Sequence, residues 1–375
     1  MFENINKLLN ISEKLGTPAM QLIIHHRGKE IFNECRGVSD EIGTLFTGRE
    51  LMNLYSCSKF VTCVAALKLY EEGKFSLEDD VADYISAFGD MTVKKSGGVF
   101  KAENRIKIKH LFTMTSGLNY QIKSREINLG VKETDGECPT VKMMEYIAKM
   151  PLKFEPGESW NYGLSHDVLA AVVEIVSGKR FGEYVDEVIF KPIGMKDSTF
   201  SLPSEKLSSV CEQYLYIDTT KEYKNIGKKI AGYKLGSKYE SGGAGCVSTA
   251  ADYIKFLDAV KERKLLSDDT VRLMTKNHLT QKQLEALLAP DAYGYGLGVR
   301  VPLGDGKRTD YGWGGAAGAI AAIDEVHDIT FYYSQHACRS PFAPIRKDFT
   351  EAVKLDLGFD AFREDMGNRK GNYLA

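Results

Sequence analysis

The stretch Ser56-Cys57-Ser58-Lys59, followed by FVTCVAALKLYEE over residues 60–72, decides how the rest of the chain is interpreted. The first half of the segment 60–72 is apolar on nearly every side, which is typical of a helix buried at the centre of a protein. Gly73 comes next and predicts the end of that helix. Three residues are nearly one helical turn, so we expect the Ser56 hydroxyl and the Lys59 amine on the same face.

This spacing pairs a nucleophile with a base. Burial and the positive end of the helix dipole both disfavour charge on Lys59. A neutral lysine amine can take the proton of Ser56 and turn the serine into an acyl-accepting nucleophile. The alternative interpretation is chance, because serine and lysine are common and the tetrapeptide alone is a weak signal.

Length and composition define a broad class of protein. The 375 residues are enough for one large domain or two closely packed ones, and the formal net charge of −2 comes with no basic stripe that would favour nucleic acid. No apolar run is long enough to span a membrane, and residues 1–7 carry no secretory signal. The seven cysteines are scattered without metal-ligand spacing. They predict free thiols in a reducing, cytoplasmic compartment, with no metal or organic cofactor.

Hydrophobic periodicity predicts strands at both ends of the chain. The apolar runs 19–26 and 30–35 flank Arg27-Gly28-Lys29 and predict a hairpin. Helices are expected at 108–115, 141–150, 166–177 and 181–190, and again at 250–263, 267–276 and 343–357. Further strands are expected at 296–301, 308–313, 317–322 and 329–334. The polar stretch 121–140 predicts a long lid-like loop, and the Lys-rich segment 217–240 predicts a second connection.

This order predicts an α/β (α+β) fold with one antiparallel sheet built from both termini and flanked by helices. Residues 1–85 and 235–375 would form the sheet domain, and residues 86–234 a mainly helical subdomain. The active site is expected in the cleft between them.

A serine activated by lysine also needs a proton relay and donors for an oxyanion. Tyr162 is the candidate relay, because a turn delivers it just ahead of the helix expected at 166–177. The other interpretation is a tyrosine packed beneath a loop. The segment Trp313-Gly314-Gly315-Ala316 is the candidate oxyanion and substrate-binding element, because its near lack of side chains lets backbone N–H groups approach a substrate. A glycine-rich strand edge is the alternative.

Other signals in the chain are misleading. Ser165-His166-Asp167 has the letters of a hydrolase triad, but adjacent residues point in different directions and cannot form the relay. Cys57 adjoins Ser56 without a lysine at a matching offset, so we interpret it as a packing residue.

With these pieces in order, the chain resembles the serine β-lactamase and penicillin-binding-protein superfamily. The resemblance covers roughly residues 15–335 and is greatest to the branch of class C β-lactamases, DD-peptidases and family VIII carboxylesterases. Beyond the motifs, four stretches look like that family: residues 73–81, 110–118, 191–195 and 242–250.

The family motifs match this chain with two departures. Ser56 and Lys59 match the family's Ser-x-x-Lys, and Tyr162 matches the tyrosine of its Tyr-x-Asn, but Leu164 stands where the asparagine would be. The third motif, Lys-Thr-Gly or an equivalent, is matched by residues 313–315, with Trp313 in place of the cation. Losing one charge-assisted hydrogen bond typically costs ~1.5–3 kcal/mol. We therefore expect weakened affinity for β-lactams, and Trp-Gly-Gly here looks like the family VIII carboxylesterases.

The resemblance implies a serine acyl hydrolase, most simply a carboxylesterase acting through an acyl-Ser56 intermediate. Lys59 or Tyr162 would be the base, and the N–H groups of Ser56 and Ala316 would hold the oxyanion. The expected partner is a small ester, amide or β-lactam-like molecule, with no nucleic acid and no membrane. A β-lactamase, D-amino-acid peptidase or transacylase is the alternative, and a catalytically silent binding protein is a third.

Overall fold

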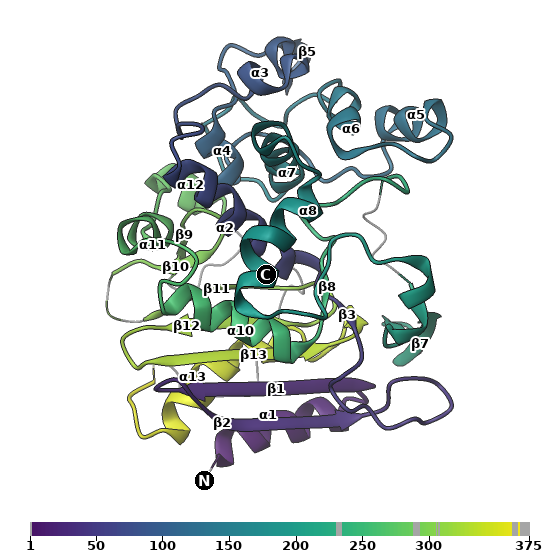
Figure 1. Ribbon diagram of the computed structural model, residues 1–375, viewed down its shortest axis with the longest axis vertical. Helices are drawn as coiled ribbons and strands as arrows, with labels where there is room; N and C mark the ends of the chain where they lie inside the picture. The colour runs from purple at the N-terminus through teal and green to yellow at the C-terminus, as the bar shows by residue number, and fades with distance from the viewer. Residues whose placement is uncertain are drawn as a thin grey trace.

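A seven-stranded antiparallel sheet forms the base of the protein. The computed structural model describes residues 2–229, 235–287, 293–304, 306, 308–361 and 367. The strand order is β2-β1-β13-β12-β11-β10-β9. The N-terminal strand β1 pairs with β13 near the other end of the chain (Figure 1), which confirms the antiparallel sheet built from both termini. The strands are β1 (Ala19–His26), β2 (Lys29–Gly37), β9 (Tyr293–Tyr295), β10 (Arg300–Pro302), β11 (Asp310–Gly314), β12 (Ile320–Asp324) and β13 (Ile329–Gln335).

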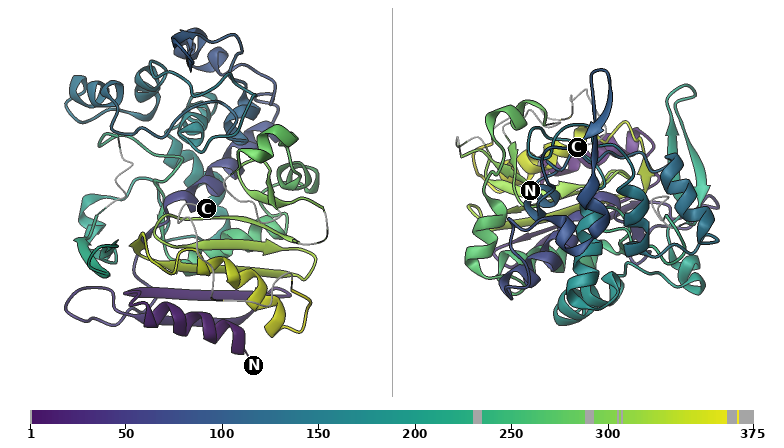
Figure 2. Two further views of the ribbon diagram at one scale, coloured as in Figure 1. Left: turned by 180° about the vertical axis from the view of Figure 1, so that it is seen from behind. Right: turned by 90° about the horizontal axis from the view of Figure 1, so that it is seen from above.

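Two helices from opposite ends of the chain cover one face of this sheet. Figure 2 shows α1 (Glu3–Lys14) and α13 (Phe349–Asp356) side by side across the rear of the strands. Met20, Leu22 and Ile24 of β1 face this layer, whereas Ile23 belongs to the core on the other side. The period of two follows from the pleat of a strand. The Asp356 carboxylate accepts hydrogen bonds from the backbone N–H groups of Asn4 (3.0 Å) and Ile5 (2.9 Å), which joins the two ends of the chain.

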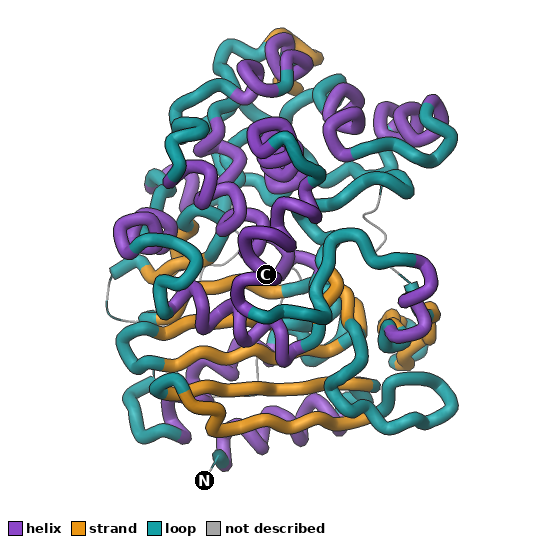
Figure 3. Tube along the Cα trace, in the orientation of Figure 1, coloured by secondary structure: helices purple, strands orange, loops and turns teal. Residues whose placement is uncertain are grey.

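The other face supports α10 (Ala250–Lys261) and the central helix α2 (Ser58–Glu71). Every residue from Ser58 to Leu67 is buried, and the chain turns away at Gly73, so the sequence prediction for this helix is confirmed. Most of the helices lie above the seven-stranded sheet in the view of Figure 3. The remaining α-helices are α3 (Val81–Tyr84), α4 (Ile108–Phe112), α5 (Arg125–Glu133), α6 (Thr140–Ile147), α7 (Ser165–Ser177), α8 (Phe181–Val185), α9 (Lys191–Ile193), α11 (Asp268–Thr275) and α12 (Gln281–Glu285).

Short elements complete the architecture. The minor sheets pair β3 (Met52–Asn53) with β8 (Val247–Ser248), β4 (Thr92–Lys95) with β5 (Gly98–Lys101), and β6 (Gln213–Ile217) with its neighbours β7 (Glu222–Gly227) and β14 (Ala337–Cys338). None of the helices within the described ranges is long and apolar enough to cross a membrane. The single-turn elements are η1 (Tyr55–Cys57), η2 (Ser86–Asp90), η3 (Asp186–Phe190), η4 (Ser204–Ser209) and η5 (Ile345–Asp348).

The predicted lid-like loop at 121–140 was wrong. Helix α5 lies within it, capped by the Ser124 hydroxyl, which accepts a hydrogen bond from the N–H of Ile127 at 3.2 Å. Gly130 in this helix allows close packing, because a Cβ there would lie 2.7 Å from the Tyr146 ring of α6. A tertiary contact of this kind stabilises a short helix whose own sequence is polar.

Three strand predictions also needed correction. The expected connection 217–240 contains a strand, β7 (Glu222–Gly227), which pairs with β6 (Gln213–Ile217); residues 230–234 lie outside the described part. Of the single strand expected at 296–301, residues 296–299 form a turn between β9 and β10, in which the N–H of Gly296 donates to the carbonyl of Val299 at 2.8 Å, and only residues 300–301 lie in a strand, β10. The strand expected at 317–322 begins three residues later, because residues 315–318 form a hydrogen-bonded turn.

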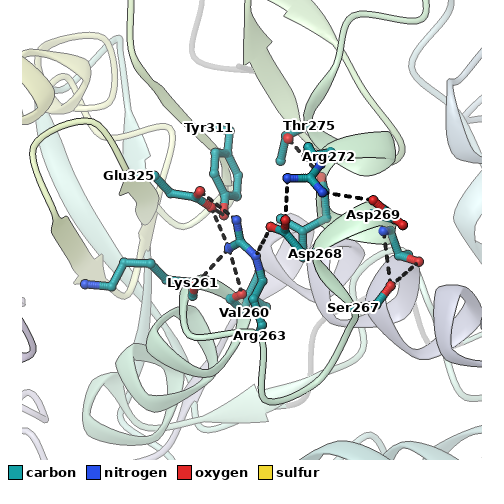
Figure 4. A network of polar contacts seen from close by, with 12 residues as sticks. Val260, Lys261, Arg263, Ser267, Asp268, Asp269, Arg272, Thr275, Tyr311 and Glu325 are labelled. Atoms are coloured by element: carbon teal, nitrogen blue, oxygen red, sulfur yellow. Dashed lines mark hydrogen bonds and ion pairs between the residues drawn. The ribbon is translucent and has the colours of Figure 1, made fainter.

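A polar network fixes β11 against the helical layer (Figure 4). Arg263, just after α10, donates two hydrogen bonds of 2.8 Å to the Glu325 carboxylate and one of 3.0 Å to Asp268. The Tyr311 hydroxyl of β11 donates to Glu325 at 2.7 Å. Burial raises the pKa of Glu325, but the hydrogen bonds from Arg263 and Tyr311 outweigh it and leave that pKa below its usual value. The anion is therefore favoured in the folded state.

Replacing Arg263 by methionine tests this network. Removing charge-assisted hydrogen bonds to a half-buried carboxylate is expected to lower the free energy of unfolding by about 2 kcal/mol at pH 7. Because the folded-state pKa of Glu325 is depressed, this stabilisation is present above the unfolded-state value near 4.5 and is lost as pH falls through the lower, folded-state value. Urea unfolding at pH 7 and near pH 3.5 measures both effects.

Arg272→Met is the matched control. Arg272 also pairs with Asp268 and Asp269, but its side chain is 66% exposed. Exposed ion pairs contribute ~0–1 kcal/mol. Equal losses in the two variants would contradict the importance of the Arg263 network.

Candidate active site

Ser56 lies in η1, immediately before α2, and its side chain is partly exposed. The preceding Tyr55 has φ of +48°, in the left-handed region that residues other than glycine rarely adopt. Its hydroxyl accepts a hydrogen bond from the Gln213 side chain, and its ring packs against Ala317. Contacts with Gln213 and Ala317 therefore stabilise the sharp turn that carries Ser56.

Lys59 is the buried centre of the site, with 0% of its surface exposed. Its Nζ donates to the Gly243 carbonyl at 2.6 Å, to Ser56 Oγ at 3.3 Å and to the Tyr120 hydroxyl at 3.5 Å. The predicted juxtaposition of Ser56 and Lys59 is therefore present in the structure. The serine oxygen lies within reach of proton exchange with the amine.

Tyr162 comes to the same place from the helical part of the protein. Lys59 Nζ lies 4.7 Å from the centroid of its ring, and its hydroxyl accepts a hydrogen bond from Trp313 Nε1 at 3.3 Å. Among the hydrogen bonds of the described residues, none joins the Tyr162 hydroxyl to Ser56 or Lys59. The ring thus contacts the amine by its face while the hydroxyl is held by β11.

Tyr120 was missed by the sequence analysis. Its ring stacks on that of Tyr162, with centroids 5.6 Å apart and an interplanar angle of 10°, and its hydroxyl faces Lys59. The available signal was its position directly after the stretch 110–118, which resembles the family. The loop expected at 121–140 begins one residue later, and Tyr120 was given no role.

Trp313, Gly314 and Gly315 form the end of β11 and the turn that follows. Trp313 is 5% exposed and packs edge-on against Tyr295, with centroids 5.2 Å apart. A Cβ at Gly315 would lie 2.6 Å from the carbonyl oxygen of Leu54, so glycine lets this turn approach the Ser56 turn closely. Within the described structure, the backbone N–H groups of Ser56 and Ala316 donate to no protein acceptor.

A buried carboxylate orders the segment that accepts Lys59. Asp167 Oδ1 accepts hydrogen bonds from the Tyr239 hydroxyl (2.8 Å) and from Ser241 Oγ (2.6 Å). A Cβ at Gly243 would lie 2.4 Å from Asp167 Oδ2 and 3.3 Å from Lys59 Nζ. Glycine at position 243 therefore lets the backbone carbonyl reach the lysine.

The misleading motifs prove to be packing residues. Ser165 bonds to Ser116 at 2.8 Å, and His166 Nε2 lies 3.2 Å from the Phe112 carbonyl, so the run 165–167 forms no triad. Burial, with a smaller effect of the Lys59 charge, lowers the pKa of His166 to about 3. Burial raises the pKa of the Cys57 thiol to about 12, which disfavours a thiolate nucleophile. In the described ranges, no cluster of histidine, cysteine and carboxylate side chains suits a metal ion.

Several known proteins are similar to this chain in sequence and in architecture. Esterase EstB of Burkholderia gladioli is 28% identical over 67% of this chain and 67% of its own length. Lovastatin esterase of Penicillium rubens is 26% identical over 90% of this chain and 92% of its own. The solved structure of EstCE1, described as a hydrolase with promiscuous acyltransferase activity, superposes with a TM-score of 0.76 at 22% identity, covering 93% of this chain and 98% of that one. The β-lactamase family profile matches residues 6–348, and the chain belongs to the β-lactamase family.

Proposed function

We propose that this protein is a serine acyl hydrolase of the carboxylesterase type, acting through an acyl-Ser56 intermediate. The observation that carries the proposal is the buried Lys59 amine, 3.3 Å from the partly exposed Ser56 oxygen. Membership of the β-lactamase family, in which relatives over most of this chain are named esterases, supports it.

The reaction would proceed in two halves. Ser56 Oγ attacks the carbonyl carbon while its proton passes to Lys59 or Tyr162, and the carbonyl oxygen becomes an oxyanion held by the N–H groups of Ser56 and Ala316. Tyr162 then gives a proton to the departing alcohol or amine as that bond breaks. Water attacks the acyl group with the same pair as base, which releases the acid and restores Ser56.

The substrate is proposed to be a small ester or amide without a charged group at Trp313. Tyr120 and Tyr162 lie beside Lys59, and Trp313 stacks on Tyr162 with ring centroids 5.8 Å apart. Leu164 is 2% exposed and offers no amide. A β-lactamase or D-amino-acid peptidase is the alternative, favoured if a chromogenic cephalosporin is turned over as fast as a good ester.

We also propose a division of the chain into two parts and a location in the cell. The sheet domain would comprise residues 1–85 and 235–375, and the helical subdomain residues 86–234, with the active site between them. The contact between Trp313 on β11 and Tyr162 ahead of α7 supports this division. A cytoplasmic location is supported by the seven cysteines, all of which are free thiols.

Ser56→Ala is expected to abolish hydrolysis of p-nitrophenyl butyrate, because the variant lacks the nucleophile. A loss of kcat/KM of at least ~10³-fold is expected from the removal of covalent catalysis. Initial rates and labelling by a fluorophosphonate probe measure the effect. Cys57→Ala is the matched control and should retain both activity and labelling. Comparable activity in Ser56→Ala and the wild type would rule out this nucleophile.

Tyr162→Phe and Tyr120→Phe separate the two phenols beside Lys59. If Tyr162 relays the proton, its phenylalanine variant should lose ~10²–10⁴-fold in kcat, as expected for a general acid–base. Tyr120→Phe keeps the stacked ring and should lose ~10-fold or less, about one hydrogen bond to the amine. Steady-state kinetics of both variants provide the measurement. The opposite ranking would assign the relay to Tyr120.

A further inference from the structure

Arg346 is a buried charge that has no counter-ion among the residues that the structure describes. This residue of η5 is 2% exposed, and neither Nε nor Nη1 has a hydrogen-bond partner. Buried arginines are normally paired with an acid, because an unpaired charge in the protein interior is costly. The burial of this unpaired guanidinium therefore requires a physical reason.

Two other arginines, one buried and one mostly buried, follow the usual rule. Arg308 pairs with Glu351, and Arg300 with Asp310 at 2.7 Å. Throughout the described ranges, no carboxylate forms an ion pair with Arg346. Burial lowers the pKa of its guanidinium to about 10, and the charge of Arg300 adds to that shift. The side chain still carries its positive charge at neutral pH.

Its position is behind the candidate oxyanion site. Arg346 Nη2 lies 3.2 Å from where a Cβ at Gly314 would stand, two residues before Ala316. A Cβ at the neighbouring Gly315 would lie 3.5 Å from Cys57 Sγ, next to Ser56. Burial raises the pKa of the Cys57 thiol, and the positive charge of Arg346 opposes that shift. The guanidinium thus lies next to Gly314, at the start of the turn that carries Ala316, whose N–H group holds the oxyanion in the proposed mechanism.

We propose that Arg346 is a positioning residue whose charge stabilises the oxyanion formed during acyl transfer. The inference rests on the proposed function, because it requires the oxyanion to form at the N–H groups of Ser56 and Ala316. It adds a fixed positive charge to the two backbone dipoles of that site.

Negative charge develops on the substrate during the attack by Ser56. The substrate carbonyl is neutral before attack, and the serine proton moves to the base as the Ser56–carbon bond forms, so new negative charge appears on the carbonyl oxygen. A fixed cation in a region of low dielectric constant lowers the energy of that oxygen far more than that of the neutral ester. The charge should therefore raise kcat and leave KM nearly unchanged.

Arg346→Met tests the proposal, because methionine fills similar space without charge. We expect kcat for p-nitrophenyl butyrate to fall ~10-fold, less than for loss of a direct oxyanion donor, with KM within about 2-fold. The inhibition constant of an alkylboronic acid, whose serine adduct is tetrahedral and anionic, should rise by a similar factor. Arg346→Lys should recover most of the loss. The melting temperature should not fall, because the unpaired buried charge is gone.

Arg308→Met is the matched control. It removes a buried arginine that has an acid partner, so it should lower the melting temperature and preserve the kcat of the folded protein. Should Arg346→Met fail to fold, Arg346→Gln allows the same comparison. Wild-type kcat and boronate affinity in the neutral variant would overturn the proposal, as would an equal loss in Arg346→Lys. Retained activity in Ser56→Ala would instead overturn the proposed function itself.

Discussion

The burial of one lysine amine organises this protein. Lys59 has no exposed surface, so every donor on its Nζ requires an acceptor inside the protein. The Gly243 carbonyl provides the shortest contact, at 2.6 Å, and it reaches the lysine only because position 243 has no side chain. Asp167 in turn holds that segment through the Tyr239 and Ser241 hydroxyls. The central helix, the segment 239–243 and the start of α7 are therefore mutually dependent, and the serine oxygen is placed by the same set of contacts.

The second organising contact joins the helical part to the sheet through aromatic rings. Tyr162 stacks between Tyr120 and Trp313, and Trp313 lies edge-on to Tyr295. Aromatic pairs prefer offset-stacked and edge-to-face geometries of this kind, which restrict how two surfaces can slide. The Tyr162 hydroxyl bond to Trp313 Nε1 adds a directional restraint. A tryptophan at this position therefore links the strand to the helical layer, in addition to shaping the surface beside the reactive serine.

The elements that could be predicted from sequence are those whose local pattern matches a buried environment. The uniformly apolar α2 and the alternating β1 were predictable because their neighbours reinforce their intrinsic periodicity. The predictions were wrong where a contact with a distant residue determines the local structure. Helix α5 depends on Gly130 packing against Tyr146, and β7 depends on pairing with β6. Ser56, Lys59 and Tyr162 were singled out from motif and order. Tyr120 was not, because only the folded structure shows a tyrosine at the end of a conserved-looking stretch facing the lysine. Arg346 gave no signal, since only the folded structure shows a buried guanidinium with no acid partner in the described ranges.

The pairing of β1 with β13 has a consequence for synthesis in the cell. Met20 of β1 lies opposite Gln335 of β13, so the sheet cannot close until nearly the whole chain has left the ribosome. At ~5–20 residues per second, the hairpin of β1 and β2 waits roughly 15–60 s for its partner, with apolar side chains on both faces of β1 uncovered. Pairing with β2 covers only one edge of β1 in that interval. The apolar side chains of β1 therefore wait for burial until the last strands of the sheet are made, and the folded protein buries them almost completely.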